Sequence, residues 1–336
     1  MAAAEHVLSV RNLRTEFRSA GGTVAAVRDV SFDLARGERI AIVGESGSGK
    51  SALALSVLGL IEPPGRVVGG EVWLNGRDIA GLSERAMQRV RGKEIAVVFQ
   101  DPMTALNPVK TIGSQIVEAL RVHEPGLRKA AARRRAVELL RDVEVPAPER
   151  RLDQYPHEYS GGMRQRVMIA IALANSPDVL VADEPTTALD VTTQAQIMDL
   201  LARVVADRGT AVILITHNLG VVAGFCDSVF VMYAGRLVER APRDELFALP
   251  VHPYTEALLG SVPRPDRLGR LVAIPGAPPD LAHLPGGCTF APRCRVGSGE
   301  EICHATVPSA HDVDVQGHRV VAECHFADAR AGRVPS

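Results

Sequence analysis

The sequence predicts an α/β fold with a mostly parallel sheet, a group of antiparallel strands near the N-terminus and a separate block of helices. Short apolar runs that read as buried strands alternate with helical segments through much of the chain. That alternation calls for a parallel sheet covered by helices. Residues 111–175 are rich in Ala, Arg, Glu and Leu and contain no β-rich run, which predicts helices.

The first predicted elements are strands. Residues 7–36 contain short apolar runs separated by the pair of glycines at 21 and 22, a pattern typical of antiparallel strands. The run of residues 70–74 is followed by Asn75 and Gly76, which favour a tight hairpin turn. Residues 95–99 predict a buried strand that ends at Gln100.

Later apolar runs complete the predicted sheet. Residues 179–182 and 211–215 predict two buried strands with a helix between them, and residues 229–238 predict a closing hairpin. Beyond about residue 250 the composition changes, because prolines and glycines crowd residues 263–287 and four of the five cysteines follow them. The predicted domains are one over residues 7–250, with a helical subdomain at about 103–176, and a small irregular cysteine-containing one over residues 251–336.

Composition limits the classes of function. Of the 336 residues 46% are hydrophobic and 23% charged, and the formal net charge is −1, so nothing drives the chain as a whole toward nucleic acid or anionic membranes. We expect no nucleic-acid partner. The N-terminus lacks a basic stretch followed by a long apolar core, and no apolar run approaches about 18 residues. A cytoplasmic chain is expected, whose membrane role would come through a partner.

Residues 44–51, GESGSGKS, fit the phosphate-binding pattern G-x-x-x-x-G-K-[ST]. An apolar strand at residues 39–43 leads into this turn and a predicted helix over residues 52–60 follows it, so several backbone N–H groups would point at one anion. Lys50 could reach the β- and γ-phosphates of a nucleotide, and the Ser51 hydroxyl could ligate Mg²⁺. The predicted nucleotide-binding residues here are Gly44, Ser46, Gly47, Ser48, Gly49, Lys50, Ser51 and Ala52.

Two acids follow the predicted strand at residues 179–182. Asp183 would hold Mg²⁺ through its coordinated water, and Glu184 would polarise the attacking water as a general base. Paired acids at a strand end are common in loops, and the phosphate-binding pattern upstream is what favours the catalytic interpretation.

A second anion-binding helix start is predicted at residues 159–166, YSGGMRQR. Two adjacent glycines open a helix at Met163, and Ser160 adds a hydroxyl, so Ser160, Gly161, Gly162 and Met163 would bind phosphate. One chain thus carries two surfaces for a γ-phosphate. The economical interpretation is that each ATP is sandwiched between the loop of one subunit and this helix start of another.

Together these motifs resemble those of ATP-binding cassette (ABC) proteins over about residues 7–250. The resemblance implies a P-loop NTPase fold with a RecA-like core, an antiparallel β-subdomain and a helical subdomain. Residues 159–163 resemble the family signature, with Tyr159 and Met163 where Leu and Gln are commonest. The complete set of motifs, Glu184 included, implies ATP hydrolysis with Mg²⁺ and argues against an inactive regulatory subunit.

The resemblance also implies roles for single residues. Gln100 looks like the glutamine that senses Mg²⁺, and Asp190, in the segment 188–190, like part of the loop at the dimer interface. His217 looks like the switch histidine that contacts the γ-phosphate, and an ordinary histidine at a strand end is the alternative. The predicted catalytic residues are thus Lys50, Glu184 and His217. Phe17 sits where the family carries an aromatic that stacks on adenine, and a core aromatic on a strand is its alternative.

Longer stretches resemble the ATPase subunits of oligopeptide, dipeptide and nickel importers, at residues 99–108, 154–166, 252–265 and 287–294. This implies an ATP-driven motor at the cytoplasmic face of the membrane, with two transmembrane permease subunits, a second ATPase subunit (a paralogue or this chain again) and an extracytoplasmic solute-binding protein. Peptides are favoured as the solute; nickel, glutathione and other small solutes are alternatives. A cassette ATPase outside transport is disfavoured, because the chain has one cassette and no sustained charged heptads.

The tail cysteines predict a further site. Cys288, Cys294, Cys303 and Cys324 are separated by five, eight and twenty residues in a segment with little apolar core, so a metal or cluster could stabilise it. The close C-x₂-C pairs typical of structural zinc are absent. The resemblance implies a [4Fe–4S] cluster, with zinc and ordinary thiols as the alternatives.

Overall fold

A computed structural model describes residues 6–19, 22–187, 189–261 and 273–332. The chain forms two compact units, which draw on interleaved parts of the sequence. The first unit comprises residues 1–9, 33–39 and 73–215, and the second comprises residues 10–32, 40–72 and 216–336. The predicted boundary near residue 250 divides the chain in another way and stays a prediction.

Three parallel strands lie at the centre of the first unit. They are β6 (Ile95–Val98), β7 (Val179–Asp183) and β8 (Ala211–Ile215), in the order β6-β7-β8. Nearly all of their side chains are buried, as expected for parallel strands covered on both faces. The three predicted strands are confirmed, and their carboxyl ends meet at one edge.

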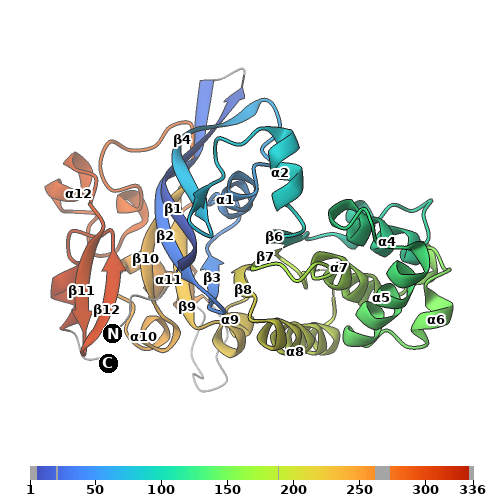
Figure 1. Cartoon of the computed structure of the whole chain (residues 1–336). Coiled ribbons are helices and arrows are strands. Elements are labelled where there is room, and N and C mark those ends of the chain that lie inside the picture. The colour runs from blue at the N-terminus through green and yellow to red at the C-terminus, as the bar shows by residue number, and fades with distance from the viewer. Residues whose placement is uncertain (1–5, 20–21, 188, 262–272, 333–336) are drawn as a thin grey trace. The chain divides into compact units, whose positions relative to one another are not determined.

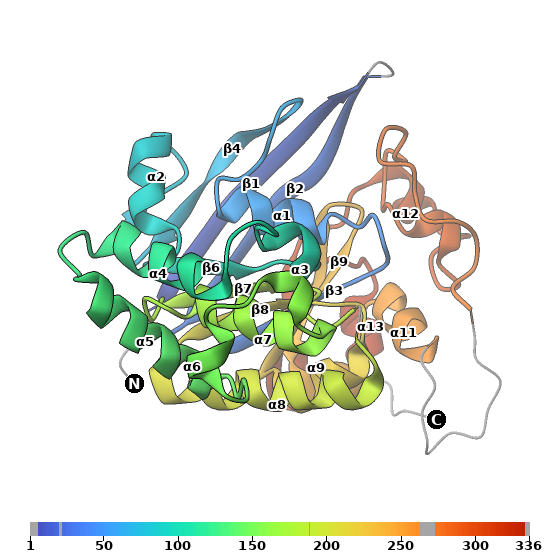
Figure 2. The same cartoon turned by 90° about the vertical axis from the view of Figure 1, so that its right-hand side faces the viewer.

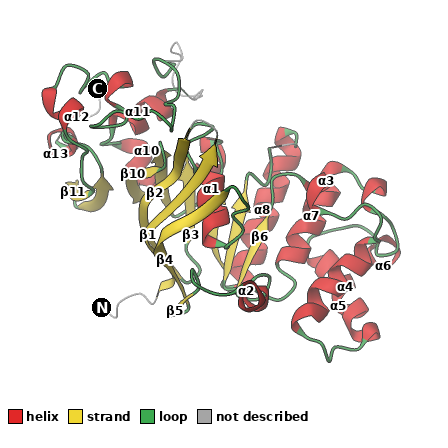
Figure 3. Ribbon diagram, turned by 90° about the horizontal axis from the view of Figure 1, so that it is seen from above, coloured by secondary structure: helices red, strands yellow, loops and turns green. Residues whose placement is uncertain are grey.

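Helices make up most of the rest of this unit. They are α2 (Glu84–Val90), α3 (Pro102–Ala105), α4 (Ile112–His123), α5 (Lys129–Asp142), α6 (Pro148–Arg151), η1 (Pro156–Glu158), α7 (Gly161–Ala172) and α8 (Val191–Arg208). Helices α4, α5 and α7 pack together (Figure 1). No strand occurs between residues 99 and 178, all of which the structure describes, and Figure 3 shows this part as helices and loops. The predicted helical block is confirmed.

Five strands form the corresponding part of the second unit, in the order β11-β12-β10-β9-β3. They are β3 (Arg39–Val43), β9 (Ser228–Tyr233), β10 (Arg236–Pro242), β11 (His311–Val315) and β12 (His318–Ala322). Strands β3 and β9 are parallel, and the predicted hairpin of β9 and β10 is confirmed.

The C-terminal tail is more regular than its composition predicted. Strands β11 and β12 form a hairpin, and β12 pairs with β10, with Glu239 opposite Ala322. The turn residues Gln316 and Gly317 have φ of 55° and 87°, as a tight hairpin turn requires. Because alternate residues of both strands are buried, the tail adds its apolar face to the sheet.

A second sheet contains β1 (His6–Ser19), β2 (Gly22–Ala35), β4 (Gly65–Leu74) and β5 (Arg77–Asp78), in the order β2-β1-β4-β5. Figure 2 shows β1, β2 and β4 as long strands that run side by side. The predicted hairpin at Asn75 and Gly76 is confirmed, since Trp73 pairs with Asp78. Beyond this hairpin, the strands are longer than the short apolar runs suggested.

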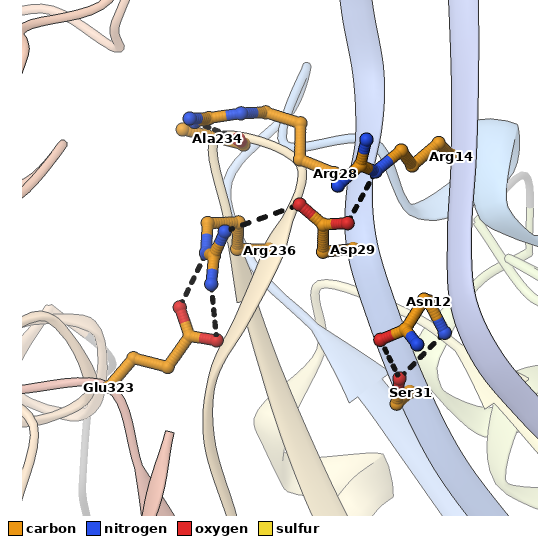
Figure 4. Close-up of polar contacts among 8 residues, drawn as sticks. All are labelled: Asn12, Arg14, Arg28, Asp29, Ser31, Ala234, Arg236 and Glu323. Carbon is orange, nitrogen blue, oxygen red and sulfur yellow. Dashed lines mark hydrogen bonds and ion pairs between the residues drawn. The ribbon is translucent and has the colours of Figure 1, made fainter. Parts of the chain in front are cut away.

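Polar contacts tie the tail to the strands of the second unit (Figure 4). The Arg236 guanidinium on β10 donates to both oxygens of Glu323, at 2.6 and 3.0 Å, just after β12. It also lies 3.9 Å from the Asp29 carboxylate on β2, which pairs in turn with Arg14 on β1. This chain of charges joins three strands and the tail.

The helices of the second unit are α1 (Lys50–Val57), α9 (Leu219–Phe225), α10 (Arg243–Ala248), α11 (Pro253–Gly260), η2 (Ala291–Arg293), α12 (Glu301–Ala305) and α13 (Ala327–Ala331). The buried Glu239 carboxylate on β10 accepts the N–H groups of Val251 and His252, which lie just before α11, at 2.8 and 3.0 Å. In the described ranges of the chain, no helix combines the length and hydropathy that crossing a bilayer requires.

Candidate functional site

The phosphate loop is closely packed against neighbouring backbone in the second unit. A Cβ placed on Gly44 would lie 2.2 Å from the Met232 carbonyl oxygen, and one on Gly49 would lie 2.3 Å from the Ala26 carbonyl oxygen. Gly49 also has φ of 105°, a conformation that residues with a side chain rarely adopt. These glycines therefore fix the path of the loop into α1.

Side chains of the loop suit an anionic ligand. The buried Lys50 ammonium donates to the Gly44 and Glu45 carbonyl oxygens, each at 2.9 Å, so it lies over the loop. The buried Ser48 hydroxyl has no hydrogen-bond partner among the described residues, whereas Ser46 and Ser51 are exposed. A buried unpaired hydroxyl, a lysine and a helix start fit a phosphate group.

In the first unit, the Glu184 carboxylate lies at the carboxyl end of β7. Its Oε2 accepts a hydrogen bond from Gln100 Nε2 and another from Thr187 Oγ1, both at 2.9 Å. Gln100 comes just after β6, so the parallel pairing of β6 and β7 brings these two predicted site residues together. Thr187 was missed by sequence reasoning, and the only available signal was its position three residues after the acid.

The backbone at Glu184 is strained. Its φ is 46°, in the left-handed region that residues other than glycine, Asn and Asp rarely occupy, and its N–H donates to the Ile215 carbonyl oxygen at 2.8 Å. Asp183, the last residue of β7, pairs in register with Ile215. The strand thus ends with two half-buried carboxylates in defined positions.

The predicted signature residues form a helix N-terminus in the first unit. Ser160 is the N-cap of α7, and its Oγ accepts the Met163 N–H at 3.3 Å. A Cβ on Gly162 would lie 2.8 Å from Thr193 Cγ2 in the first turn of α8, so the two helix starts are close. Gly161 lies near Leu189, since a Cβ on Gly161 would be 3.7 Å from Leu189 Cδ2.

Asp190 caps the next helix. Its carboxylate accepts the backbone N–H of Thr193 at 2.9 Å and the Thr193 hydroxyl at 2.7 Å, and the hydrogen bond from that backbone N–H is the main cause of the lowered pKa of Asp190. The predicted interface segment 188–190 is described only in part, since residue 188 lies outside the described residues.

Two predicted contacts to the nucleotide lie in the second unit. Phe17 on β1 is half-buried, and a Cβ on Gly65 would lie 2.5 Å from its ring, so one edge of the ring packs against β4. His217 is exposed, one residue before the N-cap Asn218 of α9. Their roles toward adenine and the γ-phosphate stay predictions.

The predicted Mg²⁺ ligands are divided between the units. Gln100 and Asp183 belong to the first and Ser51 to the second. Oxygen donors at a strand end and beside a phosphate loop have the hard chemistry that Mg²⁺ prefers. This ligand set also stays a prediction.

The predicted iron–sulfur cluster is wrong. The four tail cysteines line one small pocket with His252 and His325, but within the described ranges no group of three or more His, Cys, Asp or Glu side chains is placed to hold a metal ion. The zinc alternative fails for the same reason. Burial raises the pKa of Cys288 and Cys303, and that of Cys324 to about 11, so these thiols are protonated at neutral pH. All four tail cysteines are free thiols; Cys288 is half-buried and the other three are buried.

Two family models match this chain. The ABC transporter model matches residues 27–187, which include the phosphate loop, Gln100, the signature helix start and Glu184. A model for the C-terminal region of oligopeptide and dipeptide transporters matches residues 238–303. The second match begins on β10 and continues into the cysteine-containing tail.

Curated relatives cover nearly all of the chain. The dipeptide transport ATP-binding protein DppD of Bacillus subtilis is 53% identical over 97% of this chain and 96% of its own length. The oligopeptide transport ATP-binding protein OppD of Salmonella typhimurium is 50% identical over 90% of this chain and 89% of its own. OppD of Mycobacterium tuberculosis is also 53% identical over 97% of this chain, which spans only about half (53%) of that relative.

Solved structures agree with the fold. A dimeric ATP-binding cassette in a post-hydrolysis state with ADP and phosphate bound has a TM-score of 0.64, at 29% identity over 70% of this chain and 98% of its own. The cassette cbiO1 of Clostridium perfringens has a TM-score of 0.62, at 29% identity over 73% of this chain and 91% of its own. With its phosphate loop, its capped signature helix and the carboxylates at the end of β7, this chain belongs to the ABC transporter ATP-binding proteins, in the oligopeptide and dipeptide transport branch.

Proposed function

We propose that this chain is the ATP-hydrolysing motor subunit of a membrane importer for dipeptides or oligopeptides. The relatives named for dipeptide and oligopeptide transport support the class of solute. The single observation that carries hydrolysis is the Glu184 carboxylate at the end of β7, held by Gln100 and Thr187. A carboxylate fixed by two neutral donors is suited to accept a proton from water.

The chemistry follows from the residues of each unit. The N–H groups at the start of α1 and the Lys50 ammonium bind the phosphates of ATP. Ser51 in the second unit and Gln100 and Asp183 in the first are the residues that would hold Mg²⁺, whose charge would offset that of the phosphate groups. Glu184 accepts a proton as water attacks the γ-phosphorus; the bond to the bridging oxygen breaks, and ADP and phosphate are the products. His217 would contact the γ-phosphate.

Transport requires two such subunits, and the partner would be a paralogue or a second copy of this chain. The α7 N-terminus, with Ser160, Gly161, Gly162 and Met163, would bind the γ-phosphate of the ATP held by the other subunit. Asp190, the N-cap of α8, lies beside Thr193, which α7 approaches closely, and would contact the partner there. ATP then joins the subunits, and its hydrolysis lets them separate.

Exposed apolar side chains support a docking site for the two permease subunits in the segment after β6. The exposed fractions of Met103, Val109 and Val122 are 56%, 80% and 61%. Gln100 lies at the start of the same segment and contacts Glu184, so movement of a docked permease would reach the carboxylate. The chain would work at the cytoplasmic face of the membrane, with a solute-binding protein outside.

Replacing Glu184 with Gln tests the catalytic assignment. The amide cannot accept the proton, so we expect kcat for ATP to fall by about 10²- to 10⁴-fold while MgATP still binds. Phosphate release and calorimetric MgATP binding measure the two effects. Glu94→Gln, at a surface carboxylate paired with Arg77, is the control and should change neither. Turnover retained in Glu184→Gln contradicts the assignment.

The solute needs a separate test. The importer assembled with its permeases and binding protein should hydrolyse ATP faster when a dipeptide or oligopeptide is supplied. Nickel and glutathione serve as competing solutes in the same assay. Stimulation by either of them and not by peptides would favour the alternative importer.

A further inference from the structure

Glu45, the second residue of the phosphate loop, is contacted at every polar group it has. Its N–H donates to Tyr254 Oη at 2.8 Å, and its carbonyl oxygen accepts from Lys50 Nζ at 2.9 Å and the Ser48 N–H at 3.2 Å. Its two carboxylate oxygens accept from Arg293 at 2.6 and 2.9 Å. A residue held in this way cannot move without breaking several hydrogen bonds.

Arg293, the partner of the Glu45 carboxylate, is held firmly in the C-terminal tail. Its side chain is only 6% exposed, and that of Glu45 is 22% exposed. Its Nε donates to the Pro275 carbonyl oxygen at 2.7 Å, and its guanidinium lies 5.9 Å from the centre of the Tyr233 ring. A bidentate pair sheltered from water is stronger than an exposed one, since solvent and salt screen it less.

The Tyr254 partner is fixed by aromatic packing. The rings of Tyr233, Tyr254 and Phe290 are all buried, with centroids 4.5 to 5.3 Å apart. This packing aims the Tyr254 hydroxyl at the backbone of the loop. Burial raises the pKa of Tyr254 above its usual range, so the hydroxyl stays neutral and accepts the Glu45 N–H.

We propose that Tyr254 and Arg293 are positioning residues for the phosphate loop, which act through Glu45 and set the affinity for MgATP. They lie 209 and 248 residues from Glu45 in the chain, in the region after β10. This inference rests on the proposed function for the identity of its ligand.

The path from the tail to the nucleotide is short. Glu45 carries one of the two carbonyl oxygens to which Lys50 donates, so a shift of Glu45 also shifts the ammonium. The loop N–H groups follow the same backbone. Because the loop N–H groups and the Lys50 ammonium are the proposed phosphate ligands, loss of the contacts that hold them should appear as weaker nucleotide binding.

The experiment measures MgATP affinity by calorimetry, and kcat and KM for ATP, on the full chain. Arg293→Ala should raise the Kd and KM about tenfold, while kcat at saturating ATP changes less than about twofold. Arg293→Lys, which keeps the charge, should recover part of the affinity. Tyr254→Phe keeps the ring and removes one acceptor, so about threefold is expected.

The control is Arg208→Ala, in the first unit. The Arg208 side chain is 19% exposed, donates to the Leu173 carbonyl oxygen at 2.6 Å and pairs with the Asp142 carboxylate at 2.8 Å. Both partners lie in the first unit, whereas the loop, Tyr254 and Arg293 lie in the second. This variant should lower the melting temperature and leave the Kd for MgATP unchanged.

The decisive comparison is whether the effects of Glu45→Ala and Arg293→Ala on MgATP affinity are coupled. Glu45→Ala and Arg293→Ala should not add: the double variant should bind MgATP about as weakly as either single variant. Equal melting shifts with unchanged Kd in all of these variants would overturn the proposal and leave the ATPase assignment intact. A wild-type chain that binds MgATP but does not hydrolyse it would overturn the ATPase assignment instead, while the Kd measurements still test the positioning.

Discussion

Two glutamates of this chain are both fixed by hydrogen bonds, yet their partners differ in charge. Glu184 in the first unit accepts from the neutral donors of Gln100 and Thr187, whereas Glu45 in the second pairs with the Arg293 guanidinium. The Arg293 guanidinium holds both Glu45 carboxylate oxygens in a bidentate pair, which anchors the residue in place. The comparison separates the carboxylate that we propose as the base from one that holds the backbone.

The backbone conformations of Glu184 and of the phosphate loop also differ. Glu184 itself has the strained left-handed conformation, so the strain lies on the residue that we propose as the base. In the phosphate loop the unusual conformations fall on glycines, such as Gly49 with φ of 105°, and Glu45 does not share them. The loop is therefore shaped by glycines and fixed by Glu45, and the two functions can be perturbed separately.

The largest separate effect should come from Gly49→Ala. The added Cβ would lie 2.3 Å from the Ala26 carbonyl oxygen and would occupy a φ of 105°, so the loop has to shift. Strained backbone of this kind costs about 1–3 kcal/mol, so we expect MgATP affinity to fall by up to about 10²-fold, as measured by calorimetry. Glu184 lies in the other unit, so Glu184→Gln should show the opposite pattern, with binding kept and turnover lost.

Gly224→Ala is the matched control for that variant. Gly224 lies in α9 of the same unit, and a Cβ there would meet nothing within 4 Å. It should leave the Kd unchanged and stabilise the helix slightly. If Gly49→Ala bound MgATP as tightly as the control, the loop would not need a glycine at this position. The statement that glycines shape the phosphate loop would then be wrong.

A smaller effect is expected at Thr187. Thr187→Val removes the hydroxyl that donates to Glu184 Oε2 and keeps the shape, so kcat should fall about tenfold with KM for ATP nearly constant. Thr187→Ser, which keeps the donor, should retain most of the rate. A Val variant with unchanged kcat would mean that the Thr187 hydroxyl does not orient the proposed base.

Local patterns account for what the sequence could predict. The phosphate loop, the strands at β6 to β9 and the hairpin at Asn75 and Gly76 depend on residues close together in the chain. Ser160 and Asp190 also carried a readable signal, because Ser and Asp are favoured N-caps. These features need no knowledge of distant contacts.

The rest depended on contacts between distant residues. The pairing of Arg293 with Glu45 and that of β12 with β10 join segments far apart in sequence, and no local pattern marks them. The prediction for the tail cysteines was wrong for the opposite reason, because a local pattern was present but the required contacts were not. Their number and spacing suggested a cluster, but a metal site needs converging side chains, and composition does not supply that placement.

The smallest effect on nucleotide chemistry should come from a third glutamate, Glu239, which sharpens the comparison. It is wholly buried and accepts two backbone N–H groups, with no contact to the loop. Burial raises its pKa to about 7 from the ordinary 4.5. Between these pH values the unfolded chain ionises this group before the folded one does, so the folded state loses stability as pH rises.

Glu239→Gln removes this titration. The free energy of unfolding of the wild type relative to the variant should therefore fall as pH rises from about 4.5 to 7, by roughly 3 kcal/mol at most, and stay level above pH 7. Urea unfolding at several pH values measures the difference, in which other titrating groups cancel. The Kd for MgATP should not change, because the amide still occupies the same buried position away from Glu45. A difference independent of pH would mean that burial does not raise the pKa of Glu239, and that the Val251 and His252 N–H groups keep its carboxylate ionised in the folded chain.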